Sequence, residues 1–525
     1  MSANQIKVRR KELPEAKMNK LYLITVFAVV ILLGAIVTFS FVSYPSVFFQ
    51  SSAPLEIALD GDHQIIRVPA NGNLQEAVNR AKSGDIIILQ AGATYNEISL
   101  PNKPFTDFVT IQSSEISKLP ENVRVSPQQS NLMAKIITRG RGKSAVSGEN
   151  GANHFRFIGI EFAPSNADYI YNLVLFGAEE KKLADVPHDF EIDRCYFHSL
   201  KSGIVRRGLA LNSANTIVQN SYFEGFAFPQ EETQGICGWT GTKNIKILNN
   251  YIEGGAENIL IGGSDPASAD LIPSNIEIRG NYLNKPAEWK GKATVKTLFE
   301  LKNAKSVQFV GNNLENNWIG SAFRLTVRNQ DGKAPFSTIE DVTIKDNVIN
   351  GAGEGINILG KDDTYPSQTL KNIQIVNNLF LNISSKSFEG SGYFLQVSDG
   401  ENILIANNTV FNTGNIVTFY GVLPRNFLFR DNIVGHGNYG IHGLDDIKSE
   451  LAQRFFQNNV FVNNRGVSNS DTSYPPGNFF VQDYSSVGFV NFANNDFRLT
   501  ANSHFRGRGN ENTDIGSNLS VNSVK

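Results

Sequence analysis

An eight-residue pattern recurs along most of the chain. Apolar, variable and apolar residues are followed by two variable residues, an Asn and another apolar pair, as in "IKILNNYI" (245–252), "VTIKDNVI" (342–349) and "ILIANNTV" (403–410). The recurring position falls at gaps of 24 to 35 residues, at Cys195, Asn220, Asn250, Asn281, Asn312, Asn347, Asn378, Asn408, Asn432 and Asn459. Such regular spacing is typical of a solenoid, a propeller or a repeat array.

The repeats predict strands. Their apolar residues alternate with period two over short segments, and no repeat contains an amphipathic helix, which disfavours helical and leucine-rich solenoids. A four-stranded propeller blade barely fits the gaps, whereas two or three short strands with tight turns fit well. We therefore predict an all-β chain that folds as a right-handed, single-stranded parallel β-helix of about 10–12 coils. Asn suits the turn because it tolerates the left-handed conformation, and stacked Asn amides can hydrogen-bond from coil to coil.

The two ends of the repeat region support the same fold. Residues 73–95, "NLQEAVNRAKSGDIIILQAGATY", predict an amphipathic helix followed by a strand, with Leu74, Ala77, Val78 and Ala81 on the apolar face of the helix. We expect this helix to cap the open N-terminal end of the stack, where exposed strand edges would otherwise aggregate. Residues 494–517 are expected to close the C-terminal end.

These features together resemble a known superfamily. The start "AKSGDIIILQAGATY" (81–95), the Asn-turn coils and the finish "DFRLTANS" (496–503) with "DIG" (514–516) are similar to extracellular right-handed β-helix proteins of the pectate-lyase-like superfamily. The resemblance spans roughly residues 60–520. Within this superfamily, the chain is similar to a group of uncharacterised bacterial β-helix proteins. It implies the fold more specifically than an activity, because such folds host many functions.

The N-terminal segment differs from everything after it. Basic residues dominate 1–20, and residues 21–42 contain no charge and are long enough to cross a bilayer as a helix. We expect a cytoplasmic basic segment (1–20), a transmembrane signal anchor (21–43), a linker (44–60) and a β-helix domain (61–525) outside the plasma membrane. A cleaved signal peptide is the alternative, although its apolar region is usually shorter.

Composition excludes some functions. The formal net charge of −2 gives no basic field for nucleic acid. The chain has two cysteines, Cys195 and Cys237, and no CxxC pair, which indicates neither a zinc site nor a disulfide framework. One bridge between them and two small buried side chains remain equally open readings.

Outward-facing charges gather on the middle coils. In "TLFELKN" (297–303), Glu300 and Lys302 alternate with apolar residues and therefore share the outer face of a strand. In "FRLTVRN" (323–329), one coil later, Arg324 and Arg328 do the same. Cations that stack about 5 Å apart repel unless carboxylates or an anionic ligand offset them. The pattern indicates a site for an acidic polysaccharide, with a stabilising ladder of ion pairs as the structural alternative.

The same strands resemble the site of polysaccharide lyases of family six, in which a Lys strand precedes an "LTLRHG"-like strand by one coil. "ELKNAKS" (300–306) and "RLTVRNQDG" (324–332) match that arrangement, although "RNQ" replaces "RHG". The resemblance implies Lys302 as the base and Arg328 as the acid of a β-elimination, with Arg324 as a neighbouring cation that assists. It also implies Glu257, Asn258 and Glu300 as possible ligands of Ca²⁺.

Further residues are candidates for substrate binding or for other chemistry. The set expected to bind sugar from the same or adjoining coils is Trp239, Trp289, Asn357, Gln396 and Arg207. A non-catalytic glycan-binding or adhesive surface protein is an open alternative, and a glycoside hydrolase using Asp362 and Asp363 is a third. His154, His188 and His198 are interpreted as isolated side chains.

Overall fold

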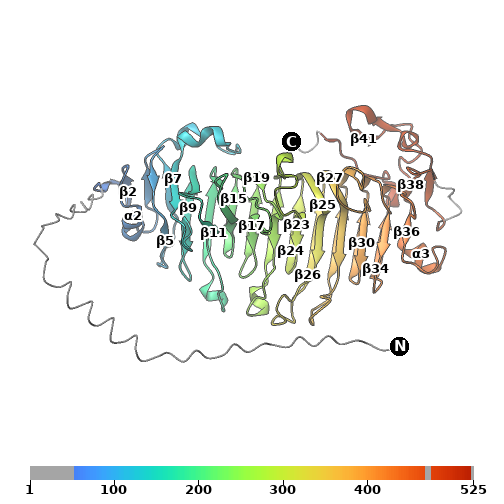
Figure 1. Ribbon diagram of the computed structural model, residues 1–525, viewed down its shortest axis with the longest axis horizontal. Coiled ribbons are helices and arrows are strands. Elements are labelled where there is room, and N and C mark those ends of the chain that lie inside the picture. The colour runs from blue at the N-terminus through green and yellow to red at the C-terminus, as the bar shows by residue number, and fades with distance from the viewer. Residues whose placement is uncertain (1–52, 467–473, 522–525) are drawn as a thin grey trace, which may run out of the picture. The chain divides into compact units, whose positions relative to one another are not determined.

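The computed structural model describes residues 53–466 and 474–521, which form a stack of parallel coils (Figure 1). Among these residues no helix is long and apolar enough to cross a membrane, and the predicted anchor at 21–43 lies outside them. One face is a 15-stranded sheet in which all strands but β1 run parallel. Its strands are β1 Glu56–Asp60, β2 His63–Val68, β3 Ile86–Leu89, β6 Val109–Ser113, β9 Asn153–Ile158, β12 His188–Asp193, β15 Ala214–Gln219, β18 Lys243–Leu248, β21 Ser274–Arg279, β24 Ala304–Val310, β26 Ile339–Lys345, β28 Lys371–Val376, β31 Glu401–Ala406, β34 Arg425–Arg430 and β37 Phe456–Gln457.

The other two faces belong to one 24-stranded sheet, because β25 Asn313–Thr326 and β27 Val348–Leu359 each run through both. The first of these faces contains β4 Thr94–Tyr95, β7 Ala134–Thr138, β10 Ile160–Pro164, β13 Tyr196–His198, β16 Tyr222–Glu224, β19 Tyr251–Glu253, β22 Tyr282–Asn284, β29 Leu379–Ile383, β32 Thr409–Asn412, β35 Ile433–Gly435, β38 Val460–Val462 and β39 Phe479–Val481. The second, which we call the site face, contains β5 Ile98–Leu100, β8 Val146–Gly148, β11 Tyr169–Leu175, β14 Ile204–Ala210, β17 Gln234–Gly238, β20 Glu257–Ile261, β23 Thr297–Leu301, β30 Leu395–Ser398, β33 Val417–Phe419 and β36 Ile441–His442.

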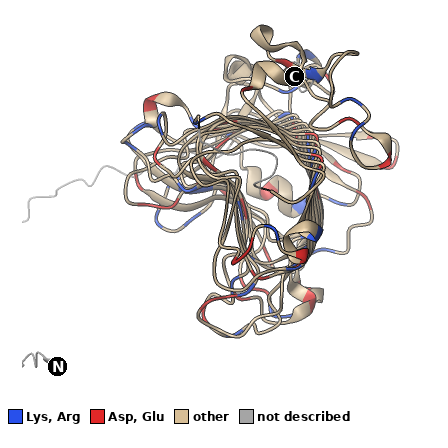
Figure 2. Cartoon of the chain, turned by 90° about the vertical axis from the view of Figure 1, so that its right-hand side faces the viewer, with Lys and Arg blue, Asp and Glu red and all other residues tan. Residues whose placement is uncertain are grey.

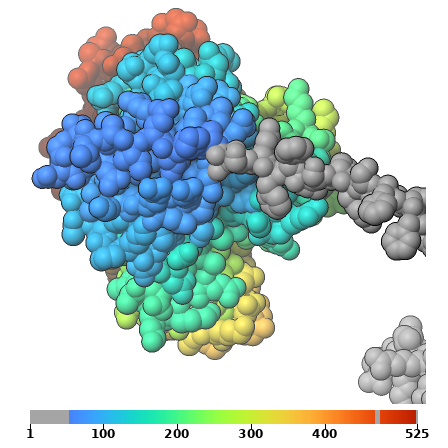
Figure 3. Space-filling model, turned by 90° about the vertical axis from the view of Figure 1, so that its left-hand side faces the viewer, coloured from blue at the N-terminus to red at the C-terminus, as the bar shows by residue number. Residues whose placement is uncertain are grey.

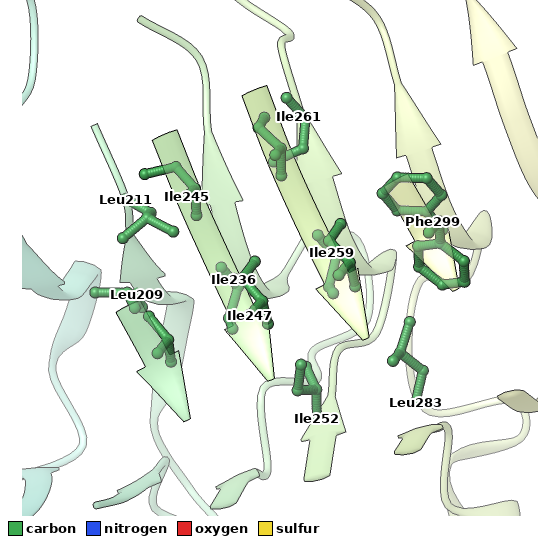
Figure 4. Packing of buried hydrophobic residues seen from close by; sticks show 14 of the residues in the cluster. Leu209, Leu211, Ile236, Ile245, Ile247, Ile252, Ile259, Ile261, Leu283 and Phe299 are labelled. Atoms are coloured by element: carbon green, nitrogen blue, oxygen red, sulfur yellow. The ribbon is translucent and has the colours of Figure 1, made fainter. Parts of the chain in front are cut away.

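The coils stack in register around an apolar core. On the site face Leu209, Ile236, Ile259 and Phe299 are successive partners in the ladder, and all of them are buried (Figure 4). Each such side chain contributes about 1.5–3 kcal/mol when it leaves water. The coils superpose closely in the view along the axis, and longer loops leave the stack on several sides (Figure 2).

The predicted Asn turn uses two neighbouring columns. Asn249, Asn377 and Asn407 hold the left-handed conformation, with φ of 52°, 56° and 52°. In these coils the next residue is an Asn whose side chain is buried in a ladder that runs from coil to coil. In one step of this ladder, the amide N and Nδ2 of Asn281 both donate to Oδ1 of Asn312, at 2.9 and 3.0 Å. Asn220 was assigned to the ladder wrongly, because it is itself left-handed and Ser221 accepts the bond from the amide of Cys195.

A helix covers the N-terminal end as predicted. In α2, Leu74–Arg80, the side chains of Leu74, Ala77 and Val78 are buried, and Asn73 caps the helix by accepting from the amide of Glu76 at 3.1 Å. The first described residues, from residue 53 onward and coloured blue, lie at this end of the stack (Figure 3).

The C-terminal residues differ from the expectation. The short helix α3, Glu450–Phe455, packs on β34 and β37 at the last coils, with Phe455 buried. The segment after the antiparallel pair β40 Phe489–Asn491 and β41 Asp496–Leu499 runs back along the side of the stack, where the amide of Asn518 donates to Oδ1 of Asn377 at 2.9 Å.

Two smaller expectations also changed. The stack has more coils than expected, because the strands before β12 lack the Asn motif. Cys195 and Cys237 are both buried free thiols, so the disulfide reading is wrong, and burial raises the pKa of Cys195 to about 12 and that of Cys237 to about 11.

Candidate active site

The charged residues of the middle coils lie in register on the outer side of the site face. Glu300 in β23 pairs with Arg324 in β25, which pairs with Asn357 in β27 and then with Gln396 in β30. The alternating partners Phe299, Leu301, Phe323 and Leu325 are all buried in the core. The predicted orientation of Glu300, Lys302, Arg324 and Arg328 is therefore confirmed.

These side chains surround a pocket of about 320 Å³, which we call the cationic pocket. It is lined by Lys296, Glu300, Lys302, Arg324, Thr326, Arg328, Asn357, Leu359, Asp363 and Tyr420. Four of these residues are cations and two are carboxylates, so the balance of charge depends on how they pair.

Lys296 neutralises the carboxylates at the floor of the pocket. Its Nζ lies 2.8 Å from Glu257 Oε1, 3.5 Å from Glu300 Oε2 and 3.3 Å from Glu232 Oε1. The side chain of Glu257 is completely buried and also accepts a hydrogen bond from Gln234 Nε2 at 2.8 Å. Lys296 therefore supplies the charge that two buried carboxyl groups need.

The two carboxyl groups differ in protonation. Burial favours the neutral acid at Glu257, but the ammonium of Lys296 outweighs it and holds the pKa of Glu257 below its ordinary value. Burial raises the pKa of Glu300, and although Lys302 opposes this, the charge of Glu257 adds to it. Glu257 is therefore the ionised partner of Lys296, and Glu300 is the group that holds a proton more readily.

Two cations of the pocket are left without a carboxylate partner. No acidic side chain among the described residues lies within 4.0 Å of the charged nitrogens of Lys302 or Arg324, and the buried Nε of Arg324 has no hydrogen-bond partner there. Arg328, by contrast, pairs with Asp363 at 2.5 Å. Lys302 and Arg324 thus give the pocket an uncompensated positive charge that suits an anionic ligand.

The loop after β27 positions Arg328. Asp362 accepts hydrogen bonds from the amides of Asn329, Thr364 and Tyr365 at 2.8, 2.7 and 2.9 Å. Burial opposes ionisation there, but these amides hold the pKa of Asp362 below its ordinary value. Asp362 ties the loop to the strand end and Asp363 pairs with Arg328, so both carboxylates of the hydrolase alternative are engaged in structural contacts.

The residues predicted to bind calcium do not converge on a site that fits the ion. Asn258 is buried and points away, because its Nδ2 donates to the carbonyls of Ile252 and Asn284 at 2.8 Å and its Oδ1 accepts from Lys285 Nζ at 2.9 Å. Oxygens of Glu257 and Glu300 converge instead on the ammonium of Lys296. Calcium takes six to eight oxygen ligands, whereas here the ammonium of Lys296 already occupies the space between the two carboxyl groups.

Of the residues predicted to bind sugar, only Asn357 lines the cationic pocket. Asn357 and Gln396 continue the column away from Arg324 and are joined by a 3.2 Å hydrogen bond. On the other side, the guanidinium of Arg207 stacks 4.8 Å from the ring of Trp239, whose Nε1 donates to the carbonyl of Ala178. Trp289 lies in the short helix η5, Ala287–Trp289, and lines none of the cavities on the site face.

Two pocket residues were missed by sequence reasoning. Lys296 immediately precedes "TLFELKN", and its position beside that strand was the available signal. Tyr420 follows β33 three coils beyond Arg324, and its OH donates to the carbonyl of Ile358 at 3.3 Å. No pattern in the sequence indicates that this tyrosine reaches back to the pocket.

The chain is similar to several solved structures. The PL6 family alginate lyase AlyGC is similar to this chain at 14% identity with a TM-score of 0.51, over 88% of this chain and 59% of that chain. The PL6 family polysaccharide lyase of Pseudopedobacter saltans matches at 13% identity and a TM-score of 0.44, over 87% of this chain and 99% of that one. Pectate lyase Pel9A matches at 13% identity and 0.36, over 87% and 96% of the two chains.

At 14% identity the similarity to AlyGC shows a shared fold, a parallel β-helix. No protein-family model matches the chain, and no curated protein matches it significantly in sequence.

Proposed function

We propose that this protein is a polysaccharide lyase that cleaves an acidic polysaccharide by β-elimination at the cationic pocket. The observation that carries the proposal is the pair of uncompensated cations, Lys302 and Arg324, on the outer side of neighbouring strands. A uronate sugar offers both the carboxylate that such cations bind and a C5 proton next to that carboxylate. The fold shared with PL6 alginate lyases is consistent with this class of substrate.

In the proposed mechanism Arg324 binds and neutralises the uronate carboxylate, which makes the C5 proton more acidic. Lys302 takes that proton, and the electron pair of the C5–H bond forms the C4–C5 double bond. The C4–O bond breaks, and Arg328 donates a proton to the departing glycosidic oxygen. In this step Lys302 acts as the free amine and becomes an ammonium when it has taken the proton.

Lys296 supports this chemistry from below. Its ammonium lies 2.8 Å from Glu257 Oε1 and 3.5 Å from Glu300 Oε2, while neither Lys302 nor Arg324 forms an ion pair with a carboxylate of the described residues. We therefore propose that the chain acts without bound calcium, with the Lys296 ammonium as the cation of the site floor.

An activity assay with matched variants tests the proposal. The purified full chain is incubated with alginate, pectate and glycosaminoglycans, and the unsaturated product ends are followed by their ultraviolet absorbance. We expect cleavage of at least one uronate polymer, unchanged by EDTA and lost in Lys302→Ala. Lys361→Ala is the control, because Lys361 lies two coils beyond Lys302 and pairs with Asp399 at 3.7 Å.

The other functional classes predict different results. Reducing ends without ultraviolet absorbance would indicate a hydrolase. Retention of the polymer without cleavage would indicate a glycan-binding surface protein, for which the stacked Arg207 and Trp239 provide a binding platform.

We also propose that residues 21–43 anchor the protein in the plasma membrane with the β-helix outside. The uncharged run after a basic segment supports this placement. The β-helix would then be periplasmic or on the cell surface, so protease treatment of cells stripped of their outer envelope should digest it while the membrane fraction keeps an N-terminal tag. Protection of the β-helix from protease, or its release in soluble form, would contradict the proposal.

A further inference from the structure

Two histidines and an aspartate come together on the 15-stranded sheet, away from the cationic pocket. His154 is in β9, and His188 and Asp189 are in the adjacent strand β12. One ligand atom of each residue lies within 4.8 Å of the others, and Asp189 Oδ2 is 2.5 Å from His188 Nδ1 and 3.9 Å from His154 Nε2. The prediction that His154 and His188 are isolated is therefore wrong.

Two of the remaining polar atoms of the cluster are held by neighbours. His154 Nδ1 is 2.8 Å from Asn153 Oδ1, which leaves Nε2 facing the cluster. Asp189 Oδ1 accepts from Asn215 Nδ2 at 3.0 Å, which leaves Oδ2 facing the histidines. Metal-binding histidines and carboxylates are typically oriented by such outer hydrogen bonds.

The backbone does not explain why these residue types are here. His154 and Asp189 occupy a left-handed column, with φ of 55° and 57°, in which most later coils carry Asn and two carry Ser306 and Asp341. There the Asn side chains form an exposed ladder, in which Asn244 donates to Asn215 and Asn275 to Asn244, each at 2.8 Å. Asn would satisfy the backbone at His154 equally well, and Asp341 shows that a carboxylate is accommodated in the column without a metal. The imidazoles of His154 and His188 beside the carboxylate are therefore the feature that points to a ligand.

The surroundings leave room for a cation. The side chains of His154, His188 and Asp189 are 22%, 39% and 27% exposed, so the cluster is open on one side. The nearby guanidinium of Arg156, which stacks on Phe108 beside His154, is already paired with Glu191 at 2.6 Å. Its charge is therefore compensated.

We propose that His154, His188 and Asp189 bind a divalent transition-metal ion of the zinc class, with a solvent-facing position left open. Imidazole nitrogen with one carboxylate suits zinc and its neighbours and does not suit calcium, which takes oxygen ligands. Bonds of about 2.0–2.1 Å place tetrahedral ligands about 3.3 Å apart, so small side-chain rotations close the present separations. The ion links the strands of two neighbouring coils.

The test measures metal binding by the full chain without a polyhistidine tag. After chelation and dialysis, Zn²⁺ and Co²⁺ are titrated by calorimetry, and Co²⁺ absorption reports tetrahedral nitrogen and oxygen coordination. We expect one ion per chain, no competition from an equal concentration of Ca²⁺, and at least a tenfold loss of affinity in His154→Asn and in His188→Ala.

The variants keep the fold measurable. Asn is the residue that most later coils use in the left-handed column, so His154→Asn should fold normally, and its thermal unfolding provides the check. His198→Ala is the matched control, because His198 lies on another face and pairs with Glu161 at 2.8 Å. Absence of Zn²⁺ binding, equal affinity in His154→Asn, or an equal loss in His198→Ala would each overturn the proposal.

Discussion

Replacing Lys296 with Ala should reveal how the buried carboxyl groups of the pocket are neutralised. The side chains of Glu257 and Glu300 are 0% and 3% exposed, and Lys296 lies within 3.5 Å of both. Removing one member of a buried ionic cluster leaves uncompensated charge and typically costs ~3–5 kcal/mol at neutral pH. Acidification should reduce this loss, because the carboxyl groups of the variant take up protons as the pH falls.

The same variant should acquire a response to calcium. Without the ammonium, oxygens of Glu232, Glu257 and Glu300 face a common space, which is the type of ligand that Ca²⁺ prefers. Calcium at one hundred times its dissociation constant should restore about 2.7 kcal/mol by mass action. The wild-type chain should not be stabilised by Ca²⁺.

Urea unfolding of the full chain, followed by circular dichroism with and without Ca²⁺, measures both effects. Lys305→Ala is the control: Lys305 pairs with Glu340 at 2.6 Å, but its side chain is 40% exposed, and such a pair is worth at most about 1 kcal/mol. An equal loss in the two variants, or a wild-type chain that calcium stabilises as much as Lys296→Ala, would refute the reasoning.

Three further predictions concern the Asn ladder, the buried carboxyl group of Glu253 and the predicted sugar-binding residue Trp239. Asn312→Ala removes the hydrogen bonds that Asn281 donates and leaves these buried donors unpaired. The free energy of unfolding measured in urea should therefore fall by ~3–5 kcal/mol. An unchanged free energy of unfolding would mean that the ladder does not stabilise the fold. Burial, reinforced by neighbouring carboxylates, raises the pKa of Glu253 to about 7. The free energy of unfolding of the wild type should therefore fall by up to ~3 kcal/mol relative to that of Glu253→Gln as the pH rises from 4.5 through 7. Parallel pH profiles of the two proteins would contradict this. Trp239→Ala should raise KM for the cleaved polymer roughly threefold to tenfold with little change in kcat, because it removes the stack with Arg207 but no reacting group, and an unchanged KM would place the substrate elsewhere.

The fold could be predicted because its signal repeats. Each coil carries the same Asn turn and the same period-two strand, so errors in one copy, such as the one-residue shift at Asn220, do not change the conclusion. Alternation within single strands also predicted that Glu300 and Lys302 face outward. These inferences depend on local geometry that each strand specifies by itself.

The site was less predictable because it depends on contacts between coils. Lys296 is significant only because Glu257 and Glu232, from earlier in the chain, converge on its ammonium. Asn258 was expected beside Glu257, but Lys285 from the following coil holds it elsewhere. His154 and His188 are 34 residues apart, close to the length of one coil, so their stacking was detectable from the repeat and was overlooked.

The most direct test of the proposed function is the rate at which unsaturated ends form on a uronate polymer. The full chain should cleave at least one of alginate, pectate or a glycosaminoglycan. Lys302→Ala should retain the fold and bind the polymer without cleaving it, while Lys361→Ala should cleave at the wild-type rate. Absence of cleavage of any uronate polymer by the wild type, or equal cleavage by Lys302→Ala, would contradict the assignment of a lyase site to the cationic pocket.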